Sequence, residues 1–151
     1  MLIFFELLGC QKTPNVTDDD VVCLRISCTH MAFSYSYNFK IGIKDDVVLF
    51  SCDCSIDKEN HNDTRVSCEN VEIDNQYFRQ LLEILKKNNV TETVRKHKKK
   101  INLFFVPDKT EYSISLNFKN DVQLSADLHF EEVYTFLKQL ASLYATEVTN
   151  E

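Results

Sequence analysis

The chain has 151 residues and a formal net charge of −6, with 44% hydrophobic and 26% charged residues. A chain of this length can bury an ordinary core, and the two glycines and two prolines argue against a low-complexity or disordered protein. The negative charge disfavours wholesale binding to nucleic acid or to an anionic membrane. We therefore expect one domain spanning residues 1–151, with no nucleic-acid partner and no membrane partner.

The N-terminal residues 1–10 are almost entirely apolar and end in Leu-Leu-Gly-Cys. This ending has the form of a lipoprotein cleavage box in which Cys10 would carry the lipid. A signal peptide, however, needs a basic start and an uninterrupted apolar core, whereas Glu6 interrupts this run and the first cation is Lys12. We expect a buried strand at residues 2–8 instead. A secreted lipoprotein with disulfides is the alternative.

A strict alternation of large and small side chains predicts the central strand at residues 33–43. Successive side chains in a strand point to opposite faces, so this period of two puts every large residue on one side. Those large residues are Phe33, Tyr35, Tyr37, Phe39, Ile41 and Ile43. We expect an antiparallel sheet with this face packed and the other face wet.

Similar patterns predict the remaining elements in chain order. Further strands are expected at 22–28, 47–54, 65–73, 101–106, 112–118 and 122–128, with hairpins over 33–54 and 112–128. Asp74 is the expected N-cap of a first helix, which ends at Asn88-Asn89 and covers the aromatic face of the central strand. A second helix carries the apolar residues Val133, Leu137, Leu140, Ala141 and Tyr144.

The expected fold class is therefore α+β, with a mostly antiparallel sheet built of hairpins and two helices packed on one face. Each predicted hairpin leads into a helix, so two hairpin–helix halves are an alternative description of the same chain. No apolar run reaches the ~18 residues that a membrane helix needs. We expect a cytoplasmic protein.

Motifs of known enzymes are missing from the sequence. Gly9 and Gly42 are its only glycines, which excludes glycine-rich phosphate loops. It contains no G-x-S-x-G elbow and no H-E-x-x-H pair either. His129, near the start of the second helix, is expected to cap the helix or to be buried in its neutral form. We expect a protein that is not an enzyme and that uses no cofactor.

Four cysteines of the first half are the candidate metal ligands: Cys23, Cys28, Cys52 and Cys54. Thiolates are ligands that zinc prefers. Two rises of a strand separate Cys52 from Cys54 by about 7 Å, which is too wide for one zinc tetrahedron unless the strand bends. We expect reduced thiols that pack as small apolar side chains. A thiol- or zinc-binding protein is the alternative.

The largest cluster of charge is basic and contains Arg95, Lys96, Lys98, Lys99 and Lys100. A basic run can bind an acidic protein surface or a phosphate backbone. Aromatic residues that would stack on bases are absent from it. We expect residues 90–100 to be a solvated connector and these five residues to be the candidates for partner binding.

The functional prediction follows by elimination. Compactness, negative charge and the missing motifs favour a small acidic, non-catalytic protein-binding module with an immunity- or inhibitor-like role. Its unidentified partner is expected to be a protein. The faces of strands 33–43 and 112–118 that lie opposite the large residues are rich in Ser and Asn, which suits a wet protein contact.

Overall fold

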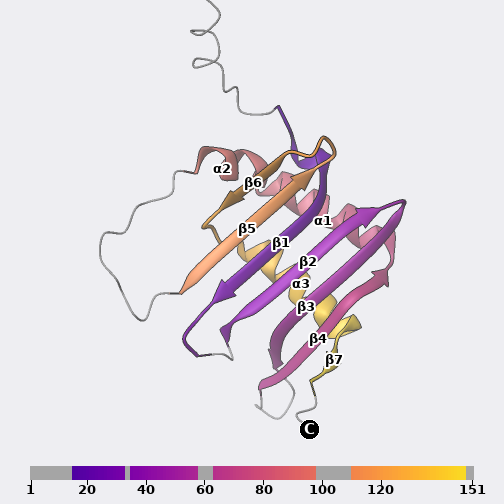
Figure 1. Cartoon of the computed structure of the whole chain (residues 1–151), viewed down its shortest axis with the longest axis vertical. Coiled ribbons are helices and arrows are strands. Elements are labelled where there is room, and N and C mark those ends of the chain that lie inside the picture. The colour runs from indigo at the N-terminus through magenta and orange to yellow at the C-terminus, as the bar shows by residue number, and fades with distance from the viewer. Residues whose placement is uncertain (1–14, 33–34, 58–62, 98–109, 149–151) are drawn as a thin grey trace, which may run out of the picture.

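The computed structural model describes residues 15–32, 35–57, 63–97 and 110–148, and in this part of the chain helices lie against one face of a single sheet (Figure 1). The sheet has seven antiparallel strands in the order β6-β5-β1-β2-β3-β4-β7. Their bounds are β1 Val21–Thr29, β2 Tyr37–Lys44, β3 Val47–Asp57, β4 Asp63–Ile73, β5 Glu111–Phe118, β6 Gln123–Ala126 and β7 Thr146–Glu147. The helices are α1 Asn75–Lys87, α2 Val90–Lys96 and α3 Glu131–Tyr144, and a 3-10 turn precedes β1 at Asp18–Asp20. The predicted α+β class is confirmed, with three helices in place of two.

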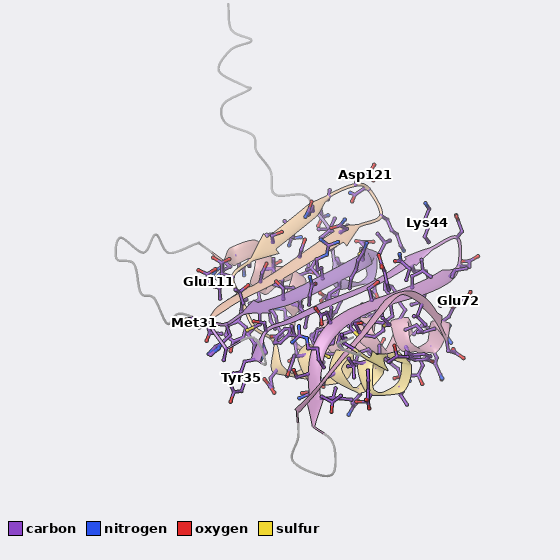
Figure 2. The ribbon with its side chains drawn as sticks, turned by 60° about the horizontal axis from the view of Figure 1, so that its bottom comes forward. Met31, Tyr35, Lys44, Glu72, Glu111 and Asp121 are labelled. Carbon is purple, nitrogen blue, oxygen red and sulfur yellow. The ribbon has the colours of Figure 1, made fainter. Side chains whose placement is uncertain are left out.

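Strands β1 to β4 form a continuous meander, and the β2–β3 turn shows why the hairpin forms there. Asp45 and Asp46 both have positive φ, 53° and 62°. Two consecutive left-handed residues are the signature of the two-residue turn that matches the twist of a hairpin, and Asp tolerates this conformation. The predicted hairpin is therefore present from Tyr37 onward. Tyr35 precedes β2 and is exposed near Met31 (Figure 2), while Phe33 lies outside the described residues.

The chain then crosses the sheet. It leaves β4 through α1 and α2 and returns at the other side, where β5 pairs with β1 (Figure 1). The β5–β6 turn is closed by the backbone N–H of Phe118, which donates to the carbonyl of Val122 at 2.9 Å. After α3, strand β7 pairs with the outer edge of β4. The last described elements therefore lie beside β4, far from β5 in the sheet.

Helix α1 has the start and stop signals that the sequence predicts. The carboxylate of Asp74 accepts a hydrogen bond from the backbone N–H of Gln76 at 2.9 Å. This bond satisfies one of the unpaired N–H groups at the start of the helix. At the other end Asn89 takes the left-handed conformation with φ 51°. The helix buries Phe78, Leu81 and Leu85 against the sheet.

The aromatic end of β2 is covered by α3. The ring of Tyr134 in α3 lies 4.6 Å from the ring of Tyr37 and 6.2 Å from that of Phe39, measured between centroids. The sequence pattern predicted that the first helix would cover these rings. At Tyr37 and Phe39 the second predicted helix, α3, makes the contact instead. Hydrophobic periodicity reports which face of a helix is buried, and it does not report which strand that face meets.

The prediction of a solvated connector at residues 90–100 is wrong for residues 90–96. They form helix α2 and bury Val90, Thr91 and Val94. Four β-branched residues in seven lower the intrinsic helix propensity of this segment. The structure compensates with apolar residues at i and i+4 and with ion pairs from Glu92 to Arg95 and Lys96. These contacts explain why propensity alone missed the helix.

Two predicted strands, 2–8 and 101–106, lie outside the described residues, as does Cys10. Among the residues that the structure does describe, no helix is long and apolar enough to cross a membrane.

Candidate functional site

The sheet face opposite the helices is the candidate binding surface, and we call it the open face. In the described part of the chain no helix covers it (Figure 1). Strand pairing places small polar side chains in rows across it, because directly opposite residues share a face. Its members include Cys23, Arg25, Ser27, Asn38, Lys40, Ser51, Asp53, Ser67, Ser113, Ser115 and Asn117.

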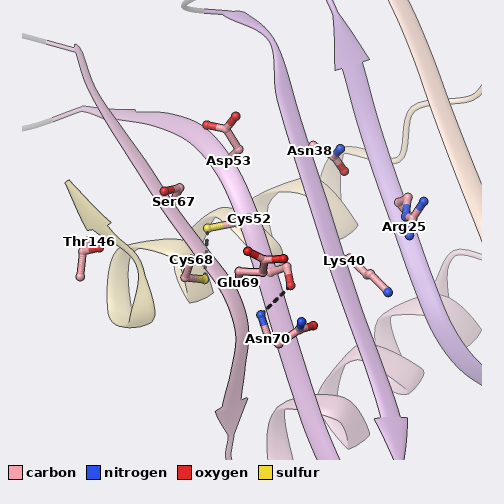
Figure 3. Close-up of a pocket in the computed structure, with 11 residues that line it drawn as sticks. Arg25, Asn38, Lys40, Cys52, Asp53, Ser67, Cys68, Glu69, Asn70 and Thr146 are labelled. Atoms are coloured by element: carbon pink, nitrogen blue, oxygen red, sulfur yellow. Dashed lines mark hydrogen bonds between the residues drawn. The ribbon is translucent and has the colours of Figure 1, made fainter. Parts of the chain in front are cut away.

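A hollow of about 710 Å³ lies in the open face over β1 to β4 (Figure 3). A β-bulge shapes its wall, because two residues of β4, Glu69 and Asn70, stand opposite one residue of β3, Ser51. Asn70 has φ 50°, and its backbone N–H donates to the Ser51 hydroxyl at 2.9 Å. A bulge bends its strand and increases the local twist. The bulge therefore helps to make this part of the sheet concave.

Two cations stand side by side at one wall of the hollow. Arg25 of β1 is directly opposite Lys40 of β2, and both are exposed. Neither side chain forms a hydrogen bond or an ion pair within the residues that the structure describes. Like charges directly opposite each other destabilise a sheet. The pair is thus unfavourable for folding, and neither cation is in an ion pair in this part of the chain.

The other wall of the hollow is acidic. Asp53 of β3 accepts a hydrogen bond from Nε of Arg65 at 2.7 Å, and Nη1 of Arg65 donates to the carbonyl of Ser36 at 2.7 Å. Glu69 is exposed at the β4 side of the hollow. The hollow therefore presents cations over β1 and β2 and carboxylates over β3 and β4, with Ser and Asn side chains between them.

The structure does not gather the four candidate metal ligands. Cys23 is on the open face opposite Gly42, where a Cβ atom on Gly42 would lie 3.3 Å from the Cys23 sulfur. Cys28, Cys52 and Cys54 are buried on the covered face. Cys23 and Cys28 are five residues apart on one strand, and an odd separation puts them on opposite faces. Within the described residues, no three His, Cys, Asp or Glu side chains are placed to hold a metal ion.

A different set of thiols is brought together instead. Cys68 of β4 is directly opposite Cys52 of β3, and their sulfur atoms are 3.6 Å apart (Figure 3). The pairing depends on the register of two strands that a polar stretch of sequence separates, so no local pattern in the sequence indicates it. The cysteines of the described residues are all free thiols: Cys23, Cys28, Cys52, Cys54 and Cys68.

Hydrogen bonding and burial set the acidity of these thiols. The hydrogen bond to Cys54 and burial raise the pKa of Cys52. The same hydrogen bond lowers the pKa of Cys54 from its ordinary value, with further help from the charges of Arg65 and Lys138 and against the effect of burial. Burial raises the pKa of Cys23. Cys54 therefore loses its proton before Cys52 does.

The basic run divides into parts with different environments. Arg95 is 17% exposed, and its guanidinium forms an ion pair with Glu92 and donates to the carbonyl of Val16 at 2.5 Å. The Arg95 side chain therefore connects α2 to the segment before β1. Lys96 is 75% exposed and lies 3.3 Å from Glu92. Lys98, Lys99 and Lys100 lie outside the described residues, so partner binding by this run stays a prediction.

His129 ties the start of α3 to the sheet. Its Nδ1 lies 3.1 Å from the Tyr37 hydroxyl and its Nε2 lies 2.6 Å from the Glu131 carboxylate. Both contacts are satisfied when Nε2 carries the proton and Nδ1 accepts from the phenol. Burial, with added effects of Cys28 and Tyr134, raises the pKa of Tyr37 and keeps its phenol protonated. The cluster is therefore suited to holding α3 in place and poorly suited to nucleophilic attack by Tyr37.

Comparison with known proteins adds no further assignment, since no family model, no curated protein and no solved structure matches the chain.

Proposed function

We propose that this chain is a small, acidic, non-catalytic protein-binding module and that the open face is its binding surface. An immunity- or inhibitor-like role is one form of this activity. The observation that carries the proposal is the opposed pair Arg25 and Lys40 at the hollow. A carboxylate from a partner, placed between the two cations, would replace their repulsion with attraction.

The composition of the open face supports a protein as the partner. Its small hydroxyl and amide side chains can hydrogen-bond to a partner directly or through water, as in the polar part of protein interfaces. The two walls of the hollow bear opposite charge, which supports a partner with an acidic group facing β1 and β2 and a basic group facing Glu69. The net charge of −6 would attract a basic protein at long range, and these local charges would fix how it docks.

The place of action that we propose is the cytoplasm. The five cysteines of the described residues are free, and thiols stay reduced in that compartment. This part of the proposal is independent of the open face and predicts that freshly isolated protein carries six alkylatable thiols, counting Cys10.

Capture from a lysate of the source cells tests the proposal. The full chain is compared with Arg25→Gln/Lys40→Gln and with the matched control Arg79→Gln/Lys119→Gln, which loses the same charge at an exposed position of α1 and in the turn after β5. We expect the wild type and the control to retain one protein in a saturable, salt-sensitive manner. The Arg25/Lys40 variant should bind it about tenfold or more weakly.

Two results would contradict this assignment. One is equal capture by all three proteins, which would move the binding surface away from the hollow. The other is the absence of any saturable capture by the wild type. Circular dichroism of each variant shows whether the fold is retained, so that loss of binding is not confused with unfolding.

A further inference from the structure

The thiols of Cys52 and Cys68 are positioned to react with each other. They occupy directly opposite positions of neighbouring antiparallel strands, and their sulfur atoms are 3.6 Å apart. Opposite residues of such strands have Cα atoms about 4.5–5.5 Å apart, which is inside the range of about 4.4–6.8 Å found in disulfides. We propose that Cys52 and Cys68 form a reversible disulfide between β3 and β4 when the chain meets a disulfide oxidant such as oxidised glutathione.

Competing pairs are less well placed. Cys54 is two residues from Cys52 on the same strand, so their Cα atoms are about 6.6–7 Å apart, at or beyond the limit for a disulfide. Cys23 lies on the other face of the sheet opposite Gly42. Cys28 belongs to β1, with β2 between it and β3. Strand register therefore selects one partner for Cys52.

The surroundings allow the small movement that a bond requires. The two sulfur atoms must approach each other by about 1.5 Å to reach the bond length of about 2.05 Å. Glu69 and Asn70, which form the β-bulge, follow Cys68 directly, and a bulge leaves residues outside the regular ladder of hydrogen bonds. Apart from its contact with Cys52, the thiol of Cys68 has one weak acceptor, the carbonyl of Phe50 at 3.8 Å. Little is lost when that contact is given up.

Access decides the order of attack. Cys68 is partly exposed on β4, whereas its neighbour Cys52 is only 5% exposed (Figure 3). The Cys68 thiolate attacks the glutathione disulfide, a mixed disulfide forms, and one glutathione leaves as a thiolate that takes up the proton released by Cys68. Cys52 then attacks the Cys68 sulfur, and the second glutathione leaves with the proton that Cys52 releases. The protein dithiol loses two electrons and two protons, and one glutathione disulfide becomes two thiols.

Titration of the full chain with mixtures of oxidised and reduced glutathione tests this proposal. After acid quenching, the denatured protein is alkylated and mapped by peptide mass. We expect two of the six thiols to disappear together and the lost pair to be Cys52 and Cys68. Cys23→Ser, the matched control, should behave as the wild type. Cys68→Ser should keep its five remaining thiols, and Cys52→Ser should stop at a mixed disulfide between glutathione and Cys68.

Three outcomes would overturn the proposal: retention of all six thiols in oxidised glutathione alone, a disulfide that maps to another pair, or the same loss of two thiols in Cys68→Ser. Peptide mapping of the unmutated chain reads the pair directly, so the test does not depend on the variants folding. The proposal is independent of partner binding, because its readout needs no partner.

Discussion

The two faces of one sheet have opposite properties in this protein. On the covered face, Phe39, Ile41 and Phe50 are fully buried beneath helices. On the open face the residues between them along the same strands include Asn38 and Lys40, which are exposed. Alternation along each strand gives both faces at once, and only the covered face contributes a large hydrophobic free energy.

This difference separates stability from recognition. Substitutions on the covered face should change the free energy of unfolding, whereas substitutions on the open face should leave it nearly unchanged or improve it. The opposed cations Arg25 and Lys40 illustrate the second case, because they oppose folding slightly in the free protein. Residues of this kind are expected where a binding surface is kept at some expense of stability.

The largest difference in unfolding free energy between substitutions on the two faces is expected for neighbouring residues of β2. Phe39→Ala removes a fully buried ring that stacks on Phe50 and contacts Tyr134, so it should cost about 3–5 kcal/mol of unfolding free energy. Asn38→Ala, one residue away on the open face, should change it by less than about 0.5 kcal/mol. Urea denaturation measures both values, and equal costs would contradict the assignment of faces.

Alkaline pH tests the covered face at Tyr37. Burial, more than any neighbour, raises the pKa of this phenol, so the folded state keeps a proton that the unfolded chain releases above about pH 10. The free energy of unfolding should therefore fall as the pH rises above about 10 and should not depend on this group below it. Tyr37→Phe should reduce the fall by up to about 1.4 kcal/mol per pH unit.

The matched control for that experiment is Tyr35→Phe, because Tyr35 is exposed near the same end of the sheet (Figure 2). Its pH profile should follow that of the wild type. A profile of Tyr37→Phe that also coincides with the wild type would show that the phenol ionises equally in both states.

A smaller effect is expected where α1 begins. Asp74→Ala removes the carboxylate that accepts from the backbone N–H of Gln76, which should cost about 1 kcal/mol of unfolding free energy. Gln80→Ala, at an exposed position inside the same helix, should leave stability unchanged or slightly higher. Thermal denaturation followed by circular dichroism distinguishes them, and an unchanged Asp74→Ala midpoint would argue against the cap.

The smallest effect is predicted on the open face. Lys40→Gln and Arg25→Gln should each leave the unfolding free energy unchanged or raise it by about 0.2–1 kcal/mol, since either change removes the repulsion. The double variant should have about the same unfolding free energy as either single variant. A double-mutant cycle measures this lack of additivity. A loss above about 1 kcal/mol in Lys40→Gln would show that the lysine has a structural partner.

Local patterns in the sequence predicted much of the fold. Alternation identified β1, β2 and β5, Asp74 marked the start of α1, and the apolar stripe located α3. These elements could be predicted from the sequence because each is specified by residues close together in the chain. Helix α2 was missed because contacts with the rest of the protein outweigh its β-branched composition.

The candidate sites were harder to predict from the sequence, for a different physical reason. Arg25 and Lys40 face each other because of the register of β1 and β2. Cys52 and Cys68 face each other because of the register of β3 and β4, which the bulge shifts. Register is set by side-chain packing and turn geometry over the whole sheet. The Ser- and Asn-rich open face was foreseen from strand parity, whereas its hollow and its charge pattern required the structure.

The most direct test of the central claim is a hydroxyl-radical footprint of the complex with the captured partner, compared with the free chain. We predict protection of β1, β2 and β3 at open-face residues such as Arg25 and Lys40, with α1 and α3 unchanged. Protection of the helical side, or of α2 around Lys96, with the open face still reactive would contradict the account.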